Sequence, residues 1–98
     1  MAFEIQWTKR ADKKLDQIIS HLQQDWGEKS VRDFMTYLYD FLDLLSGYPE
    51  IGAIQYPEKG IRAFVLKKQL TIYYKVSGKQ ILLLDLFDNR SDPDTKIF

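Results

Sequence analysis

Two stretches of apolar residues at helical spacing, separated by one glycine, constrain the fold of this chain most strongly. In the first stretch, apolar side chains recur every three or four residues, at Ala11, Leu15, Ile18, Ile19, Leu22 and Trp26. The second stretch repeats this spacing at Val31, Phe34, Met35, Leu38, Phe41, Leu42 and Leu45. Each predicts an amphipathic helix with one buried face. Gly27 is a suitable end for the first helix, and so short a connection predicts an antiparallel helical hairpin.

A short strand is predicted before the hairpin. Phe3, Ile5 and Trp7 alternate with more polar residues, which is the period-two pattern of a half-buried strand. Thr8 follows as a plausible N-cap for the first helix.

Three further strands are predicted after the hairpin. Residues 48–60 contain two prolines and two glycines and are predicted to form a loop. The β-rich segments 61–66, 70–76 and 80–87 are separated by turns at 67–69 and 77–79, which predicts antiparallel pairing. The expected fold is α+β in the order β-α-α-β-β-β, with an antiparallel sheet and the hairpin packed on one face.

Alternation along these strands assigns side chains to two faces. The predicted core face is apolar and consists of Ile61, Ala63, Val65, Leu70, Ile72, Tyr74, Val76, Leu82, Leu84 and Leu86. The predicted open face mixes aromatic and charged residues: Arg62, Phe64, Thr71, Tyr73, Lys75, Leu83, Asp85 and Phe87. Exposed apolar side chains on an open face predict a docked partner. The alternative is that residues 88–98 fold back and cover that face.

Length and composition exclude several classes of protein. The 98 residues suit one domain, 1–98, with a single core. The chain has no cysteine and one histidine, His21, which excludes disulfides, thiolate nucleophiles and paired-histidine metal sites. No metal or other cofactor is therefore predicted. No apolar run is long enough for a membrane span, and no signal-peptide core is present, so we expect a cytoplasmic protein.

The charges balance over the whole chain but not along it. There are 14 basic and 14 acidic side chains. Residues 1–50 carry 6 basic and 9 acidic ones, whereas residues 51–98 carry 8 and 5. Residues 61–79 contain basic residues and no acidic ones, which predicts either a local positive face or lysines that only keep the sheet soluble.

Six short motifs are spread in order over nearly the whole chain. They are IQWTKRA at 5–11, DWG at 25–27, YPEIG at 48–52, Ile61-Arg62, Ile72-Tyr73-Tyr74, and LDLFDNRSDP at 84–93. Each motif is weak alone, but the ordered series resembles the RelE/ParE superfamily of bacterial toxins. The β-α-α-β-β-β topology of that family agrees with the order of elements predicted from the residues.

The resemblance implies a toxin of a type II toxin–antitoxin pair, often described as a plasmid stabilisation protein. Such a toxin inhibits growth and is neutralised by a cognate antitoxin encoded nearby. RelE-like members are ribosome-dependent ribonucleases that cut messenger RNA, whereas ParE-like members inhibit DNA gyrase. The nuclease branch has a late tyrosine or histidine where this chain has Phe87-Asp88-Asn89, which favours the ParE-like branch. Neither branch is expected to contact a membrane or to bind a specific DNA sequence by itself.

The candidate site residues depend on the branch. For a ribonuclease, the resemblance implies phosphate contacts from Arg62 and Arg90, with Tyr73 or Lys75 assisting. The structural alternative for Arg62 is an ion pair with Asp85 or Asp88, and that for Arg90 is an ion pair with Asp92 or Asp94.

For a toxin that acts by binding, the expected partner surface consists of Phe64, Leu83, Asp85 and Phe87. A third hypothesis is a non-toxic interaction domain of the same fold, whose sheet face only docks a partner.

Overall fold

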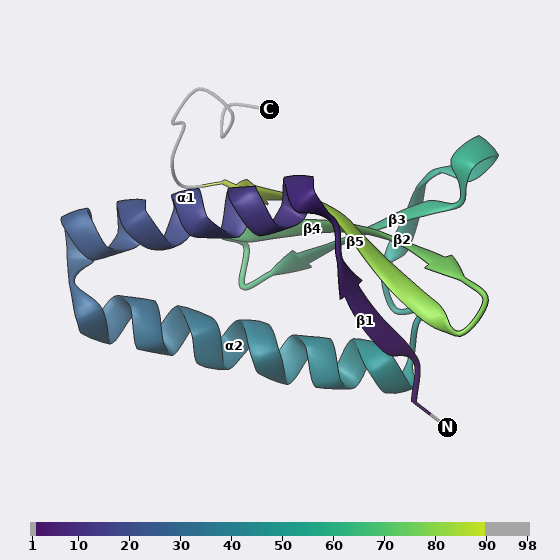
Figure 1. Cartoon of the computed structure of the whole chain (residues 1–98), viewed down its shortest axis with the longest axis horizontal. Coiled ribbons are helices and arrows are strands. Elements are labelled where there is room, and N and C mark those ends of the chain that lie inside the picture. Colours follow the sequence, from purple (N-terminus) through teal and green to yellow (C-terminus); the bar gives the residue numbers. More distant parts are fainter. Residues whose placement is uncertain (1, 90–98) are drawn as a thin grey trace.

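The computed structural model describes residues 2–89, which form a helical hairpin packed on one side of a five-stranded sheet (Figure 1). In chain order the elements are β1 (Glu4–Trp7), α1 (Lys9–Trp26), α2 (Glu28–Gly47), β2 (Ala53–Tyr56), the 3-10 helix η1 (Pro57–Lys59), β3 (Ile61–Leu66), β4 (Leu70–Ser77) and β5 (Gln80–Asp88). The α+β class and the predicted order of elements are confirmed. Within the described residues, neither helix is both long and apolar enough to span a membrane.

The hairpin forms where the sequence predicts it. The Thr8 hydroxyl oxygen accepts a hydrogen bond from the Ala11 N–H at 3.2 Å and so caps α1. Gly27 has a φ of 87°, a conformation that favours glycine, and its N–H donates to the Leu22 and Gln23 carbonyls. Because α2 begins at the next residue, the chain reverses within one residue and the helices run antiparallel (Figure 1).

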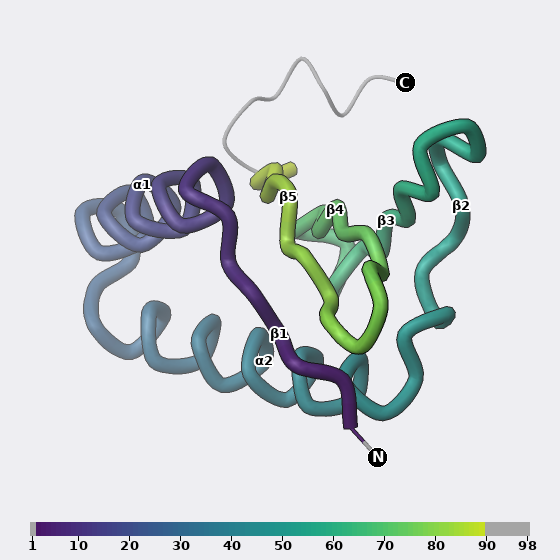
Figure 2. Tube along the Cα trace, turned by 45° about the vertical axis from the view of Figure 1, so that its right-hand side comes forward, coloured from purple at the N-terminus to yellow at the C-terminus, as the bar shows by residue number. Residues whose placement is uncertain are grey.

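The sheet has the order β1-β5-β4-β3-β2 and is mixed. The β3–β4 and β4–β5 pairs are antiparallel as predicted. An antiparallel β2–β3 pair is added to them, and β1 pairs in parallel with β5, where an antiparallel sheet was expected. Residues 48–60, predicted to be a loop, also contain β2 and η1. The connection that holds η1 projects beyond the rest of the sheet, as Figure 2 shows from a second angle.

On the N-terminal side of a β-bulge in β5, the prediction of which side chains face the core is wrong. Tyr74 pairs with Leu83 and Tyr73 pairs with Asp85, so Leu84 is the extra residue. One extra residue reverses the alternation, and for this reason the core side chains of β5 are Ile81, Leu83 and Leu86. Leu83 is fully buried and does not lie on the open face, whereas the predicted burial of Leu86 is confirmed.

The predicted faces of β3 are reversed along the whole strand. Phe64 pairs directly with Ile72 and Arg62 with Tyr74, and directly paired residues share a face. Phe64 therefore points toward the helices, where its ring stacks on that of Phe41 with centroids 4.5 Å apart. Val65, predicted to be in the core, is 51% exposed. Nothing in the residues of β3 marks its inner face, because both faces are rich in apolar side chains.

The core lies between the hairpin and the inner face of the sheet. The other residues of the two predicted helical stripes are buried or partly buried, whereas Trp26, predicted to end the first stripe, is 68% exposed. Leu70, Ile72 and Tyr74 are buried on β4 as expected. The buried apolar residues are Ala11, Leu15, Ile18, Leu22, Leu38, Phe41, Leu42, Leu45, Leu70, Ile72, Tyr74, Ile81, Leu83 and Leu86.

Candidate functional site

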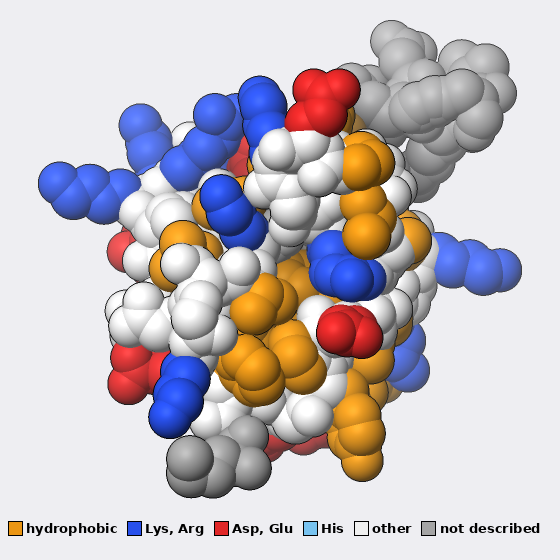
Figure 3. Space-filling view, turned by 90° about the vertical axis from the view of Figure 1, so that its right-hand side faces the viewer, with side chains coloured by type: hydrophobic (Ala, Val, Ile, Leu, Met, Phe, Trp, Pro, Cys, Tyr) orange, Lys and Arg blue, Asp and Glu red, His pale blue; other side chains and the backbone are white. Residues whose placement is uncertain are grey.

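An open groove lies on the face of the sheet that the helices do not cover. It has a volume of about 650 Å³ and collects residues from α1 and its N-cap Thr8, from β2 and from the three C-terminal strands. Figure 3 looks onto the sheet end of the molecule, where hydrophobic side chains gather at the centre and Lys and Arg side chains lie around them. The lining consists of Thr8, Arg10, Tyr56, Ile61, Tyr73, Leu84, Asp85 and Phe87.

Asp85 is held at one side of the groove by contacts to α1 and to its own strand. The Arg10 Nε lies 3.1 Å from Asp85 Oδ2, and the Lys14 ammonium lies 3.9 Å from Oδ1. Asp85 Oδ1 also accepts the Leu86 backbone N–H at 2.8 Å, next to the bulge. The side chain of Arg10 is 73% exposed and that of Asp85 25%, so the pair fixes the carboxylate while leaving most of the guanidinium in solvent. An exposed pair of this kind contributes little stability, about 0–1 kcal/mol.

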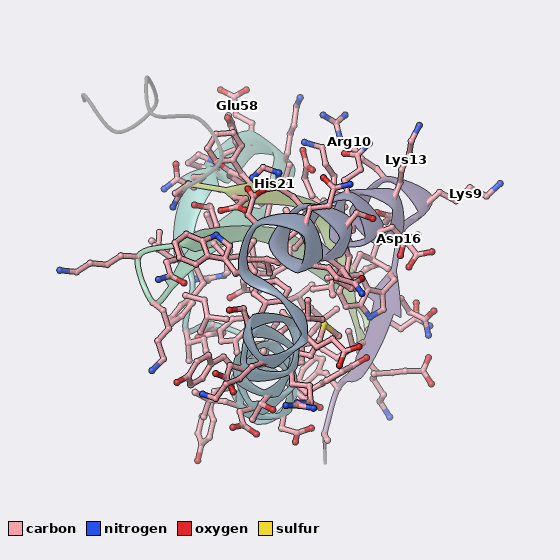
Figure 4. All side chains as sticks on the ribbon, turned by 90° about the vertical axis from the view of Figure 1, so that its left-hand side faces the viewer. Lys9, Arg10, Lys13, Asp16, His21 and Glu58 are labelled. Carbon is pink, nitrogen blue, oxygen red and sulfur yellow. The ribbon has the colours of Figure 1, made fainter. Side chains whose placement is uncertain are left out.

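The first turns of α1 carry a group of basic residues, of which Arg10 lines the groove. Lys9, Arg10 and Lys13 project outward from the helix (Figure 4), and Lys14 reaches Asp85. The net acidic charge of residues 1–50 hides this group, because the nine acidic residues of that half outnumber its six basic ones. The signal was present, since four of the six residues from 9 to 14 are Lys or Arg.

Aromatic side chains form much of the rest of the lining. Tyr56 of β2 is 54% exposed and Phe87 of β5 is 36% exposed. Tyr73 of β4 lies between them in chain order and also lines the groove. Tyr56 was missed by the sequence analysis, because residues 48–60 were treated as a loop. Aromatic and arginine side chains are the residue types enriched where proteins bind one another.

Of the four predicted partner-binding residues, two lie in the groove and two do not. Asp85 and Phe87 line it. Phe64 and Leu83 face the hairpin and belong to the core region, so they are not available to a partner.

The residues named for ribonuclease chemistry do not converge on the groove. Tyr73 lines it, whereas Lys75 is exposed further along β4 and does not. Arg62 lies on the helix side of the sheet, where its Nη1 donates to the Gly52 carbonyl at 2.7 Å and to the Glu50 carbonyl at 3.3 Å. Arg62 therefore pairs with neither Asp85 nor Asp88 and braces the loop after α2. Arg90 lies outside the described residues, as do the residues 90–98 on which the predicted covering of the open face depends.

Tyr74 braces the same loop from the core. Its hydroxyl donates to the Pro49 carbonyl at 2.7 Å and accepts the Gly52 N–H at 2.8 Å. Burial raises the pKa of the Tyr74 hydroxyl, while the Gly52 N–H and the Arg62 charge partly oppose that rise. Together Tyr74 and Arg62 fix the start of β2, the strand that carries Tyr56 into the groove.

The solved structures that are similar to this chain include toxin–antitoxin proteins. The chromosomal ParDE TA system from P. aeruginosa matches with a TM-score of 0.73 and 22% identity, covering 89% of this chain and 96% of that one. The toxin–antitoxin complex RelBE2 from Mycobacterium tuberculosis matches with a TM-score of 0.62 and 13% identity, covering 90% and 99%. The E. coli DinJ-YafQ toxin–antitoxin complex matches with a TM-score of 0.62 and 14% identity, covering 93% and 97%. At these identities the likeness shows a RelE/ParE-like toxin fold.

The family follows from the sequence itself. The family model described as the ParE toxin of the type II toxin–antitoxin system parDE matches residues 5–93. The chain therefore belongs to the ParE toxin family. A comparison with curated proteins finds no match.

Proposed function

We propose that this ParE-type toxin inhibits growth by binding an essential target, DNA gyrase, through the open-face groove, and that a cognate antitoxin encoded nearby neutralises it. The observation that carries this proposal is the groove itself. It joins Tyr56, Tyr73 and Phe87 to a fixed Arg10–Asp85 pair on a face that the helices leave uncovered. Aromatic anchors with a charged edge are suited to holding a protein surface.

The gyrase target rests on membership of the ParE family and on the sequence that follows Leu86. Phe87-Asp88-Asn89 stands where the nuclease branch has its late tyrosine or histidine. Phe87 lines the groove, so an apolar ring occupies this part of the site. An apolar ring binds by contact and has no proton to transfer.

The antitoxin proposal rests on the similar structures. Those from M. tuberculosis and E. coli are described as toxin–antitoxin complexes, and that from P. aeruginosa as a ParDE TA system. An antitoxin segment that folds on binding is suited to a shallow groove, because it can wrap an open surface.

Cleavage of messenger RNA at the ribosome is the second candidate function. Arg10 in the aromatic groove, with Lys9 and Lys13 on the same helix, favours it, since aromatic rings stack on bases and cations hold phosphates. The position of Arg62 disfavours it, because two backbone carbonyls already take up the Nη1 group that was expected to hold a phosphate.

Induced expression in a bacterial host tests these proposals. The wild type should arrest growth, and the double variant Tyr56→Ser, Phe87→Ser should not, because it removes two exposed groove rings. Trp26→Ser is the matched control: it removes an aromatic ring that is 68% exposed and does not line the groove, and it should stay toxic.

Primer extension on translated messages from the same cultures separates the two functions. We expect no cuts at codon positions during arrest. Cuts that appear with the wild type and vanish with the double variant would establish the nuclease instead. Normal growth under strong expression of the wild type would favour a non-toxic interaction domain.

A further inference from the structure

The outer flank of α2 carries apolar side chains with large exposed surfaces. Tyr37 is 45% exposed, Leu44 49% and Tyr48 64%. Tyr37 and Leu44 are seven residues apart, so they lie on the same side of the helix, and Tyr48 follows its last turn. Phe41, between them in sequence, is buried against the sheet. We name Tyr37, Leu44 and Tyr48 the α2 stripe.

A small hollow lies at one end of this stripe. Its volume is about 140 Å³, and its walls include Tyr37, Phe34 and Leu66 together with the acidic Asp33 and the basic Lys67. The Lys67 ammonium sits 4.0 Å from the centre of the Tyr37 ring and holds that ring in position. A hollow of this size beside a fixed aromatic ring is suited to one inserted aliphatic side chain.

The α2 stripe has an acidic border. Asp33 and Asp40 each precede a stripe residue by four positions and are therefore its neighbours on the helix surface. The sequence contains no Lys or Arg between Arg32 and Lys59, a segment that holds five acidic residues. Asp33 pairs with Lys29 at 3.5 Å, whereas Asp40 and Asp43 form no ion pair within residues 2–89.

Basic side chains lie at the start of α1, and of these Arg10 lines the open-face groove. Lys9, Arg10 and Lys13 extend from α1, away from α2 (Figure 4). The molecule thus presents a basic region at the start of α1, from which Arg10 reaches the groove and pairs with Asp85, and, separately, an apolar stripe with an acidic border. A ligand whose charges complement one surface is repelled by the other.

We propose that the α2 stripe is a second docking surface, which accepts a basic amphipathic helix of a partner protein. The spacing from Tyr37 to Tyr48 corresponds to about 16 Å along the helix axis, so a partner helix of about three turns matches it. Its apolar residues would recur every three or four positions, with one of them in the hollow beside Tyr37. Its Lys or Arg residues would face Asp33 and Asp40. A second copy of this chain does not suit the surface, because two acidic borders would face each other.

Binding of designed peptides tests this proposal and does not depend on the target of the toxin. The probe is a capped peptide of about 14 residues, with Leu every three or four positions and Lys and Ala elsewhere. A second peptide keeps the leucines and replaces each Lys with Glu. Titration of labelled peptide with the whole chain, read by fluorescence anisotropy, should show binding of the Lys peptide and none of the Glu peptide.

Matched variants locate the binding surface. Leu44→Lys and Asp40→Lys should each lower the affinity for the Lys peptide about tenfold or more. Tyr39→Ser should not, because Tyr39 is 55% exposed on another side of α2. Asp16→Lys makes the same charge change on the exposed surface of α1 and should have little effect. Circular dichroism confirms that each variant is folded.

Three results would overturn the proposal. The first is equal binding of the Lys and Glu peptides. The second is an equal loss of affinity in Asp40→Lys and Asp16→Lys, which would show only general charge attraction. The third is a dimer in sedimentation experiments that Leu44→Lys dissociates, which would assign the stripe to a second copy of this chain.

Discussion

Removal of the Tyr74 hydroxyl should destabilise the fold far more than removal of the hydroxyl of its neighbour. Tyr74 has no exposed surface, and its hydroxyl joins β4 to the loop after α2 through the Pro49 carbonyl and the Gly52 N–H. The substitution Tyr74→Phe keeps the ring and its packing but removes both hydrogen bonds.

The expected loss follows from the two groups left without a partner. A backbone group left unsatisfied away from water costs about 1–3 kcal/mol. The Gly52 N–H is buried and the Pro49 carbonyl partly so, and we therefore expect a loss of about 2–3 kcal/mol in the free energy of unfolding. For a domain of this size, that loss lowers Tm by roughly 10–20 °C.

Urea unfolding followed by circular dichroism measures this effect, with Tyr73→Phe as the control. The Tyr73 hydroxyl forms no hydrogen bond to any part of the chain between residues 2 and 89, so its loss should change the free energy by less than about 0.5 kcal/mol. A free energy of unfolding for Tyr74→Phe within about 0.5 kcal/mol of the wild-type value would refute this prediction. Equal destabilisation by both variants would also refute it.

Three further predictions concern the same loop and the β3–β4 turn. Burial keeps the pKa of Tyr74 above its ordinary value of about 10, so the unfolded chain loses this proton at lower pH than the folded chain. The free energy of unfolding should therefore fall as pH rises past about 10, and it should fall less steeply in Tyr74→Phe. Urea titrations from pH 8 to 11 measure the two slopes, and parallel curves would contradict the assignment. Gly52→Ala should lower the free energy of unfolding by about 1–3 kcal/mol, because the added Cβ would lie 2.7 Å from the Tyr74 hydroxyl oxygen and 3.0 Å from the Ala63 carbonyl oxygen. An unchanged Tm would show that the surrounding atoms move to accommodate the Cβ. Lys68 has a φ of 61°, so Lys68→Gly should stabilise by about 0.5–1 kcal/mol in thermal unfolding, and a lower Tm would show that this turn is not strained.

The helices were predictable because their signals are local. The apolar spacing, the Thr8 cap and the Gly27 turn each occupy a few consecutive residues, and the structure confirms all three. The antiparallel order of the last three strands was predictable from the short turns for the same reason.

The faces of the sheet were not predictable, because they depend on register. The bulge at Leu84 adds one residue without a glycine or proline to mark it, and that residue moves Leu83 from the open face to the core. In β3, Phe64 and Val65 are equally apolar, and only the pairing with β4 decides which one meets Phe41.

The groove was predictable only in part. Asp85 and Phe87 follow the bulge, where the predicted alternation is correct again. Arg10 and Tyr56 reach the groove through tertiary contacts, which no local pattern reports. Arg62 has the charge expected of a phosphate contact, but its hydrogen bonds to two carbonyls depend on a loop conformation fixed by Tyr74.

Supercoiling of a relaxed plasmid by purified DNA gyrase, with increasing amounts of this protein, tests the proposed action on gyrase most directly. Supercoiling should fall as wild-type protein or the Trp26→Ser variant is added. The Tyr56→Ser, Phe87→Ser variant should require about tenfold more protein for the same effect. Unchanged supercoiling at a large excess of folded wild-type protein would contradict gyrase as the target, and equal inhibition by the double variant would contradict the groove as the binding site.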